Sequence, residues 1–352
     1  MKYLFKILIL LFGTLSFSQE LIFENLFDSS LNSEIACYRI PSIVTSTNGI
    51  LIAAIDERNN TCGDLKWNRN INIVLRKSYD DGKTWTKIER IIDYPIGESA
   101  SDPSMIVDRQ TKDIFLFYNY MNLDKAKDIY RFMVIKSNDN GESWSSPKDI
   151  TDQITKKDWK NDFMFITSGR GTQSRDGTLL HCLVNLNKGT HVFGSNDHGK
   201  NWFLIDYPLK PGDESKIIEL SNGDWLVNSR VNSNKFRYSH ISKDKGKSWL
   251  SFENKDLSDP ACNASIINYN ISSEKLLLFS NAFDSNERKN LSLSISYDQG
   301  MSWKNNKTIY KGSSAYSSMT KLKNGDIGLF FEKDNYTKNV FVRVPKKWVL
   351  DK

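Results

Sequence analysis

Residues 78–85 read Ser-Tyr-Asp-Asp-Gly-Lys-Thr-Trp, the first of five segments that share the pattern S-x-D-x-G-x-x-W. The starting serines of these segments lie 59, 58, 47 and 54 residues apart. A repeat of this length is typical of one four-stranded blade of a β-propeller, so an all-β fold is expected. The segments occupy residues 78–85, 137–144, 195–202, 242–249 and 296–303.

Each segment has the chemistry of a tight turn between two strands. Its Asp side chain can accept hydrogen bonds from backbone N–H groups two residues on, and its Gly can adopt a positive φ. Its Trp supplies a large apolar side chain to the next strand. Residues before the turns, such as 71–75 and 291–295, are apolar or β-branched and predict strands. Calcium binding is the competing interpretation, but the segments lack the terminal Glu and flanking helices of a calcium-binding loop.

The composition favours one exported domain. The chain has 352 residues, 12% of them aromatic, and no Pro-rich or Gly/Ser-rich linker. Residues 1–18 combine Lys2 and Lys6 with an apolar run at 7–12, which predicts a secretory signal peptide. We therefore expect a mature domain at residues 19–352, in the periplasm or outside the cell. No apolar run reaches the ~20 residues of a membrane span, so no transmembrane segment is expected in the mature chain.

The charge and the potential ligand residues exclude several classes of function. Removing the two lysines of the expected signal peptide lowers the net charge from +6 to +4, and no basic run remains. This mild excess argues against nucleic acid as a partner and fits attraction of a small anion. The four histidines have no metal-site spacing and no C-x-x-C motif occurs, so neither a metal nor a cofactor is expected.

Several motifs outside the repeats resemble those of the sialidase family. The chain carries, in order, Tyr38-Arg39-Ile40-Pro41, the five repeats, E-S-K-I-I-E at 214–219, N-S-R at 228–230, and A-Y-S-S and F-F-E near its end. The repeats resemble the Asp boxes of that family, and the likeness extends over nearly the whole mature chain. It implies a six-bladed β-propeller with Asp-box hairpins. It also implies a retaining exo-α-sialidase that hydrolyses terminal α-linked sialic acids of glycoproteins and glycolipids.

The resemblance assigns three arginines to the carboxylate of the sialic acid. They are Arg39, Arg230 and Arg288, which are far apart in the sequence. Guanidinium groups suit this task because they bind carboxylates through paired, charge-assisted hydrogen bonds. Gathering three cations is costly unless a carboxylate offsets them. Glu332 matches the glutamate that supports the first arginine in the family.

The nucleophile implied by the resemblance is Tyr316. A second carboxylate would be repelled by the carboxylate on the anomeric carbon, whereas a neutral phenol is not. The phenol has an ordinary pKa near ~10, so it needs a base, and Glu214 matches the base of the family. Glu219 is the alternative in the same segment, but an offset of five residues places the two side chains on opposite faces of a strand.

The general acid is expected in the loop that follows the strand at residues 50–55. The resemblance assigns it to Asp64, with Arg58 as a substrate-binding arginine earlier in the segment. Asp56 and Glu57 are alternatives that adjoin the apolar strand. Asp102 resembles an aspartate near the ring hydroxyls of the sugar, although an Asp before a proline is also a common turn former.

Three questions remain open at this point. Five repeats are present for six expected blades, so either one blade lacks the turn or the two ends of the chain share a blade. Cys37 and Cys62 lie two residues before Arg39 and Asp64, and they either form a disulfide or are two small buried thiols. A trans-sialidase, an anhydro-forming sialidase and a non-catalytic sialic-acid-binding propeller are the alternative functions.

Overall fold

The computed structural model describes residues 20–271 and 274–350, so the expected signal peptide lies outside the described residues. The described chain is all-β, as predicted, and its helical content is slight. None of its helices is long and apolar enough to cross a bilayer. The helices are α1 (Thr151–Ile154) and α2 (Lys346–Leu350), together with short 3-10 segments at Ser29–Leu31, Leu65–Trp67 and Lys157–Trp159.

The strands of the described residues form five hydrogen-bonded sheets, of which four contain four or five strands. The first sheet consists of β2 (Ile35–Thr45), β3 (Leu51–Asn59), β4 (Ile71–Ser78) and β5 (Glu89–Ile92). The second has the order β11 (Gly169–Arg170), β6 (Glu98–Val107), β7 (Ile114–Asn122), β8 (Arg131–Ser137) and β9 (Lys148–Asp149). The third contains β10 (Met164–Ile166), β12 (Thr172–Gln173), β13 (Leu179–Asn185), β14 (Gly189–Ser195) and β15 (Phe203–Leu204). The fourth contains β16 (Ser215–Glu219), β17 (Trp225–Ser229), β18 (Phe236–Ser242) and β19 (Leu250–Ser258).

The fifth sheet is longer because one strand belongs to two ladders. The N-terminal part of β23 pairs with β22 and its C-terminal part pairs with β24, both antiparallel. This strand therefore joins two strand meanders into a single sheet of seven strands. The sheet contains β20 (Ser265–Ile271), β21 (Glu274–Ala282), β22 (Lys289–Ser296), β23 (Lys304–Lys321), β24 (Ile327–Lys333), β25 (Lys338–Val344) and β1 (Phe23–Asp28).

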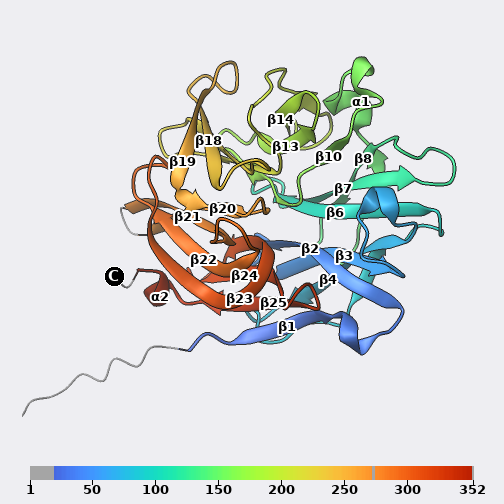
Figure 1. The fold of residues 1–352 in the computed structure, drawn as a ribbon, viewed down its shortest axis with the longest axis horizontal. Coiled ribbons are helices and arrows are strands. Elements are labelled where there is room, and N and C mark those ends of the chain that lie inside the picture. The colour runs from blue at the N-terminus through green and yellow to red at the C-terminus, as the bar shows by residue number, and fades with distance from the viewer. Residues whose placement is uncertain (1–19, 272–273, 351–352) are drawn as a thin grey trace, which may run out of the picture.

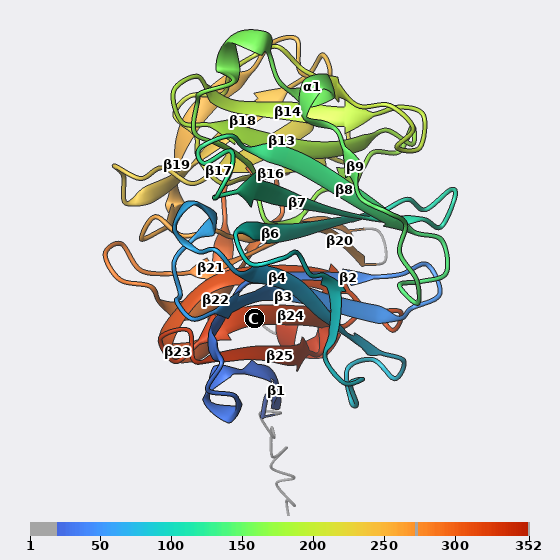
Figure 2. The same ribbon diagram turned by 90° about the vertical axis from the view of Figure 1, so that its right-hand side faces the viewer.

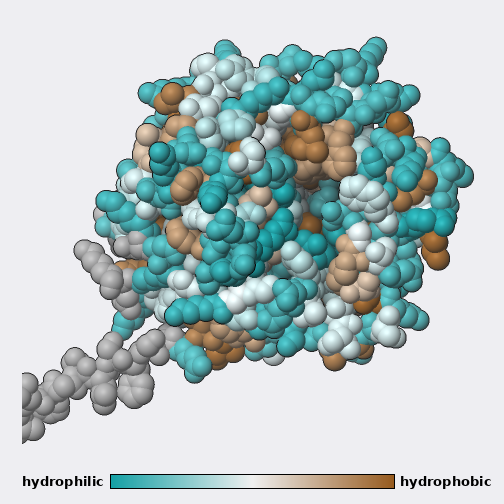
Figure 3. All heavy atoms as spheres, viewed as in Figure 1, coloured by the Kyte–Doolittle hydropathy of each residue, from teal (hydrophilic) through white to brown (hydrophobic). Residues whose placement is uncertain are grey.

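Neighbouring sheets contact one another in sequence order, and the last also contacts the first. Strand β2 contacts β6, β6 contacts β12, β13 contacts β16, β16 contacts β20, and β23 contacts β2. In Figure 1 the colour accordingly runs around the molecule, and the blue and red ends lie side by side. The side view in Figure 2 shows β2–β4 between β6–β8 and β23–β25. The face drawn in Figure 3 is hollowed near its middle, where apolar and polar side chains meet.

The five repeats form turns between the third and fourth strands of their meanders, for example between β4 and β5. The Ser78 hydroxyl accepts a hydrogen bond from the Gly82 N–H at 2.8 Å, and Gly82 has a φ of 85°. Because the serine takes this N–H, Asp80 instead binds those of Lys83 and Thr84, three and four residues on. The expected contact two residues on was therefore wrong. The serine contact, and the aspartate contact with the N–H four residues on, recur in the other four turns.

The sheet that contains both ends of the described chain has no repeat turn between β25 and β1. Strand β1 pairs with β25, so the outermost strand of this sheet comes from the N-terminal end of the chain. In the other meanders a turn connects the third strand to the fourth. Here the corresponding strands, β25 and β1, come from opposite ends of the chain, so no turn connects them. The prediction that the two ends share one unit is confirmed at the level of this sheet.

The turns also make stability depend on pH in the acid range. Hydrogen bonds from the side chain and backbone of the residue four positions on lower the pKa of Asp80, Asp139 and Asp244 to about 2. Because the unfolded carboxyls titrate near 3.8, these groups stabilise the fold fully above that pH. Their contribution is lost as the pH falls toward 2.

We expect the midpoint of thermal unfolding to decrease between about pH 4 and pH 2. A triple variant with Asp80→Asn, Asp139→Asn and Asp244→Asn should show a shallower decrease, because three of the titrating groups are gone. Asp93→Asn, at an exposed position, is the matched control and should keep the slope of the parent protein. Equal slopes in the triple variant and the parent protein would contradict the assignment.

Candidate active site

Seven of the predicted site residues line one cavity of about 420 Å³. Strand β2 provides Arg39, β6 provides Asp102 and β23 provides Tyr316, whereas the others lie in segments next to strands. The structure thus brings together residues from four of the sheets. The seven are Arg39, Asp64, Asp102, Glu214, Arg230, Arg288 and Tyr316, and the remaining two, Arg58 and Glu332, lie behind the cavity wall.

Three of the strands carry a β-bulge at the cavity. The register shifts between Arg39 and Ser42 in β2, between Ser101 and Ser104 in β6, and between Ser314 and Ser317 in β23. A bulge re-aims the side chains of its strand, and bulges are common beside active sites. Each of these bulges contains or borders a residue that lines the cavity.

Two of the bulges hold non-glycine residues at positive φ. Ile40 has a φ of 69° and Asp102 has a φ of 63°, and a β-branched residue rarely adopts such a value. Buried acceptors satisfy both backbone groups: the N–H of Ile40 donates to Glu332 and that of Asp102 donates to Asp56, each at 2.9 Å. Strained backbone of this kind concentrates at functional sites.

Tyr316 and Glu214 form the centre of the site. The Tyr316 hydroxyl donates to Oε2 of Glu214 at 2.8 Å, so the carboxylate is in position to take the phenolic proton. The same hydroxyl accepts a hydrogen bond from Nη1 of Arg230 at 3.2 Å. Burial raises the pKa of Tyr316 well above 10, Glu214 raises it further, and Arg230 and Arg288 lower it. Proton loss from this phenol therefore depends on its neighbours.

Arg39 is held by a fully buried carboxylate. Its Nε donates to Oε1 of Glu332 at 2.6 Å, and Oε2 of the same carboxylate accepts the backbone N–H of Tyr316 at 3.0 Å. Glu332 therefore links the bulge of β2 to that of β23. Burial disfavours the charge on Arg39, but Glu332 outweighs that effect with the help of nearby tyrosines, and the pKa of Arg39 is raised overall.

Arg230 and Arg288 complete the group of three cations. Nη1 of Arg230 donates to Oε2 of Glu214 at 2.6 Å. Arg288 forms no ion pair with any described residue, and its Nη atoms donate to the Tyr336 hydroxyl at 3.3 Å and to the Ala261 carbonyl at 2.9 Å. The guanidinium groups of Arg39 and Arg288 lie 5.6 and 5.5 Å from the ring centre of Tyr316.

The candidate acid Asp64 lies at the mouth of the cavity with its side chain 64% exposed. It precedes the 3-10 segment Leu65–Trp67, in the loop between β3 and β4. Nη1 of Arg58 donates to Oδ1 of Asp64 at 2.6 Å, while Nη2 donates to Asp56 at 3.0 Å. Arg58 is fully buried beneath Asp64 and is absent from the cavity lining, so its contact with substrate stays a prediction.

Asp102 lies inside strand β6 and not in a turn before Pro103. Its Oδ2 accepts a hydrogen bond from Asn119 at 2.8 Å. Burial raises the pKa of Asp102 well above 3.8, and the nearby Asp56 carboxylate adds to the shift. This position favours the interpretation of Asp102 as a residue beside the substrate over its interpretation as a turn former.

The three competing carboxylates have structural partners. Glu219 binds the side chain and backbone of Arg175 and is not part of the cavity lining. Glu57 accepts hydrogen bonds from Asn72 and Arg90, and Asp56 is fully buried beneath Arg58. The geometry therefore favours Glu214 over Glu219, and Asp64 over Asp56 and Glu57.

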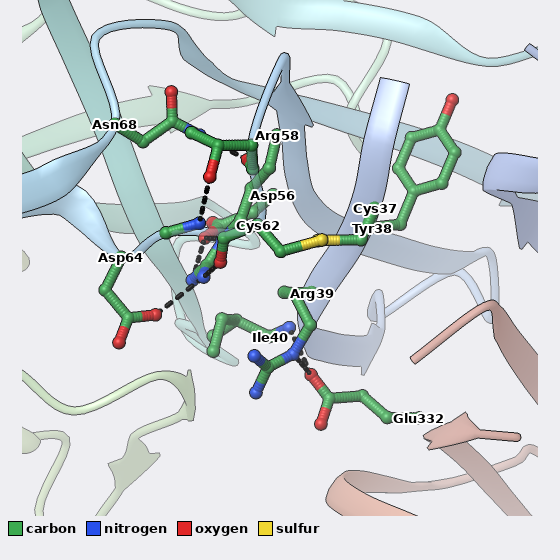
Figure 4. The surroundings of a disulfide bond; sticks show 12 residues. Cys37, Tyr38, Arg39, Ile40, Asp56, Arg58, Cys62, Asp64, Asn68 and Glu332 are labelled. Carbon is green, nitrogen blue, oxygen red and sulfur yellow. Dashed lines mark hydrogen bonds and ion pairs between the residues drawn. A yellow bond between two sulfur atoms is a disulfide. The ribbon is translucent and has the colours of Figure 1, made fainter. Parts of the chain in front are cut away.

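A disulfide connects Cys37 to Cys62, and the alternative of two free thiols at these positions was wrong. It ties the loop that carries Asp64 to the strand that carries Arg39, as Figure 4 shows. The carbonyl of Cys62 also accepts a hydrogen bond from Arg58 at 2.9 Å. Cys182 and Cys262 are free and buried.

We expect mass spectrometry of the native protein to find Cys37 linked to Cys62, with the other two cysteines alkylated only after unfolding. The disulfide spans 25 residues, and a loop of this length contributes roughly 3 kcal/mol to stability. Cys37→Ala with Cys62→Ala should remove that contribution and make the protein insensitive to mild reductant. Free thiols at both positions in the native protein would contradict the pairing.

Sequence reasoning missed several residues that line the cavity or contact its arginines. Tyr336 stacks on Arg39, with 4.0 Å between guanidinium carbon and ring centre, and no sequence signal identifies it. The mouth also contains an apolar group whose members are Leu65, Trp67, Tyr130, Phe163, Phe165 and Leu186. Of these, Trp67 is 60% and Leu186 is 49% exposed, and the buried hydroxyl of Tyr130 has no partner among the described residues.

Comparison with known proteins places the chain in a family. The family model of the BNR repeat-like domain matches residues 61–329, which is more than half of the chain. The chain therefore belongs to the family of BNR repeat-like domains.

Curated relatives of the chain are sialidases. The sialidase of Bacteroides fragilis is 29% identical over 330 residues, covering 84% of this chain and 60% of the relative. The sialidase of Micromonospora viridifaciens is 32% identical over 326 residues, covering 84% of this chain and 50% of the relative. The chain thus spans 50 to 60% of the length of these relatives. The resemblance to bacterial sialidases that the motifs predicted is confirmed.

A solved structure also resembles this one. The Hadza microbial sialidase Hz136 superimposes with a TM-score of 0.81 at 26% sequence identity. The match covers 90% of this chain and 67% of that structure. Nearly all of the described fold therefore has a counterpart in a sialidase.

Proposed function

We propose that this chain is a retaining exo-α-sialidase that hydrolyses terminal α-linked sialic acids of glycoconjugates. The observation that carries the proposal is the 2.8 Å hydrogen bond between the Tyr316 hydroxyl and Glu214, which lies among three arginines. Sialidases among the relatives support it. A non-catalytic sialic-acid-binding protein would have no need of this tyrosine–glutamate pair.

The arginines bind the carboxylate of the substrate in this proposal. Glu332 and Glu214 already offset the charges of Arg39 and Arg230, which leaves Arg288 as the cation without a carboxylate. A carboxylate placed among them gains charge-assisted hydrogen bonds, and a charge interaction is stronger beside the protein interior than in bulk water. The same contacts fix the anomeric carbon close to Tyr316.

The reaction has two steps. In the first, the Tyr316 oxygen bonds to the anomeric carbon as Glu214 takes the phenolic proton, and Asp64 protonates the departing oxygen. In the second, the Asp64 carboxylate takes a proton from water, and the water oxygen bonds to the anomeric carbon. The bond to Tyr316 breaks and the phenol regains its proton from Glu214, so all groups return to their starting state.

Arg58 is a positioning residue in this mechanism. It is buried between Asp56 and Asp64, and its short contact with Asp64 holds the carboxylate over the cavity mouth. The disulfide at Cys62 supports the same loop from the other side. The acid can therefore keep its place although its side chain is largely exposed.

The proposed architecture is a closed six-bladed propeller formed by residues 19–352. Its support is the cyclic order of sheet contacts, from β2 through β6, β12, β16 and β20 to β23 and back to β2. Dividing the seven-stranded sheet at β23 gives two of the six blades. Residues from different blades then meet near the axis, where the cavity lies.

We also propose that the protein is exported to the periplasm or the extracellular space. The disulfide supports this location, because disulfides persist in oxidising compartments. Cell fractionation and sequencing of the mature N-terminus test it. A cytoplasmic protein that retains residues 1–18 would contradict it.

The proposed activity is tested by the release of free sialic acid from 2,3-linked and 2,6-linked sialosides. Release of free sialic acid supports the hydrolase. Transfer to another sugar or formation of an anhydro product would instead identify one of the two related sialidase activities. No reaction with either linkage, despite binding of sialic acid, would contradict an enzyme.

Arg288→Ala provides the cleanest test of carboxylate binding, because Arg288 has no carboxylate partner that the substitution would leave unpaired. We expect its affinity for a sialic acid inhibitor to decrease by about tenfold to a hundredfold, the effect of losing a charge-assisted hydrogen bond. Affinity for the matching carboxamide should change little. Equal losses of affinity for the acid and for the carboxamide, measured by calorimetry, would show that Arg288 does not bind the carboxylate.

A further inference from the structure

A second cavity, of about 480 Å³, lies at the other ends of the strands that carry the active site. Strand β2 has Arg39 near its middle and Thr45 at its end, and β23 has Tyr316 followed by Lys321. With about 3.3 Å per strand residue, these positions lie roughly 15–20 Å apart along the two strands. On β16 the cavities come closer, because Lys216 of the second cavity lies two residues from Glu214 of the active site. No residue lines both cavities, so the second cavity is a separate site.

The lining of this second cavity is strongly basic. Its charged residues among those described are all Lys or Arg, and it includes no Asp or Glu. None of these basic side chains forms an ion pair with a described residue. We call the site the basic cavity and define it by Arg109, Arg170, Lys216, Lys321 and Lys323.

Arg170 shows the imbalance of charge most clearly. Its Nη1 donates to the carbonyl of Met319 at 2.7 Å and its Nε lies 3.5 Å from that of Gly171, so both partners are neutral. Burial, and then the nearby Arg109, lowers the pKa of Arg170 to about 10. The guanidinium is still charged at neutral pH, and a half-buried charge without a counter-charge is costly.

The other members also have only neutral partners. Nη2 of Arg109 donates to two backbone carbonyls, each at 3.0 Å. Lys216, which is 2% exposed, donates from Nζ to Oδ1 of Asn263 at 2.6 Å. Lys321 donates to the carbonyl of Asn270 at 3.2 Å. Burial lowers the pKa of Lys216 to about 8, and Glu214 of the active site opposes this shift. The lining of the basic cavity itself therefore contains no counter-charge, although Lys216 lies near a carboxylate outside it.

We propose that the basic cavity binds a small anion that carries a sulfate or phosphate ester. Such a group presents three terminal oxygens, so it can accept hydrogen bonds from cations on several strands at once, whereas a carboxylate has two oxygens. Guanidinium and ammonium groups are the usual donors to it. Threonine hydroxyls on the cavity wall add neutral donors. A concave volume of this size suits a sugar-sized ligand better than a flat polyanion.

Titration calorimetry of the whole chain at constant ionic strength tests the proposal, with glucose 6-sulfate and glucose 6-phosphate as probes. At least one ester should bind, and glucose and acetate should not. Arg170→Gln should lower the affinity by about tenfold to a hundredfold, and Lys321→Gln with Lys323→Gln by about tenfold. Lys243→Gln with Lys247→Gln, an equal loss of charge in an exposed repeat turn, should change it less than about twofold.

The comparison of the two esters identifies the preferred class of ligand. Lys321 and Lys323 are exposed, so their double variant should stay folded. It therefore tests anion binding even if Arg170→Gln is unstable. Absence of binding for both esters, or equal affinities in the two lysine variants, would overturn the proposal. Sialidase activity should persist in the Lys321 and Lys323 variant, so failure here is distinguishable from failure of the proposed activity.

Discussion

Tyr316→Phe should lower kcat by about a thousandfold or more while the protein stays folded. The substitution removes one oxygen and keeps the ring, which lies close to the guanidinium groups of Arg39 and Arg288. The lost oxygen is the atom that Glu214 and Arg230 contact. Because the chemistry needs a bond from this oxygen to the anomeric carbon, binding of substrate should be affected far less than turnover.

A fluorinated sialic acid that slows the second step should leave a covalent adduct on the parent protein. Peptide mapping should place the adduct on Tyr316, and Tyr316→Phe should form none. Thermal unfolding of the variant serves as the control for folding. An adduct on Glu214 or Asp64, together with an active Tyr316→Phe variant, would overturn the mechanism and leave the fold unaffected.

Glu214 should act as a unit with Tyr316. Glu214→Gln keeps the size of the side chain but cannot take the phenolic proton, so kcat should fall to a similar degree. The double variant should be little worse than either single variant, because residues that act in one step are not additive. Glu219→Gln is the matched control, since that side chain contacts Arg175 away from the cavity.

The repeats could be predicted from the sequence because their structure is local. The serine, aspartate and glycine of each turn contact backbone groups within a few residues, so eight positions are enough to determine the turn. The strands before the turns, such as β4 and β22, follow from the same segments. The prediction was wrong only about which N–H groups the aspartate binds. The serine hydroxyl accepts the N–H of the glycine, so the aspartate binds those further along the turn.

The geometry of the site depends on contacts between distant residues, which the sequence does not display. The contact between Glu332 and Arg39 joins positions 293 residues apart, and it requires the bulges in two strands. Motif resemblance could name both residues but not the bulges or the positive φ of Ile40. Tyr336 was missed for the same reason, because it reaches Arg39 from a turn without any motif.

The basic cavity was also invisible in the sequence. Its five basic residues come from four different strands or their ends, and the net charge of the mature chain is small. A search for basic runs therefore finds nothing. Lysines and arginines that are isolated in the sequence become neighbours only when the inner strands of the sheets come together.

Asp64→Asn should lower kcat/KM for natural sialosides by about a hundredfold to ten-thousandfold, the usual contribution of a general acid. The amide oxygen can still accept the hydrogen bond that Arg58 donates, so the loop should keep its position. An aryl sialoside with an acidic phenol as leaving group needs no proton to depart. Its kcat/KM should therefore decrease much less than that of a natural sialoside.

The second step distinguishes proton transfer from a structural role of the Asp64 loop. Because Asp64 also activates water, the Asp64→Asn variant should accumulate the covalent intermediate with an aryl sialoside, and azide should restore kcat since it needs no base. Asp128→Asn is the matched control: Asp128 pairs with Lys66 of the same loop and is not part of the cavity lining. The Asp128→Asn substitution should leave kcat/KM unchanged for both natural and aryl sialosides. Equal losses for natural and aryl sialosides in Asp64→Asn, without rescue by azide, would show that Asp64 positions the loop and does not transfer the proton.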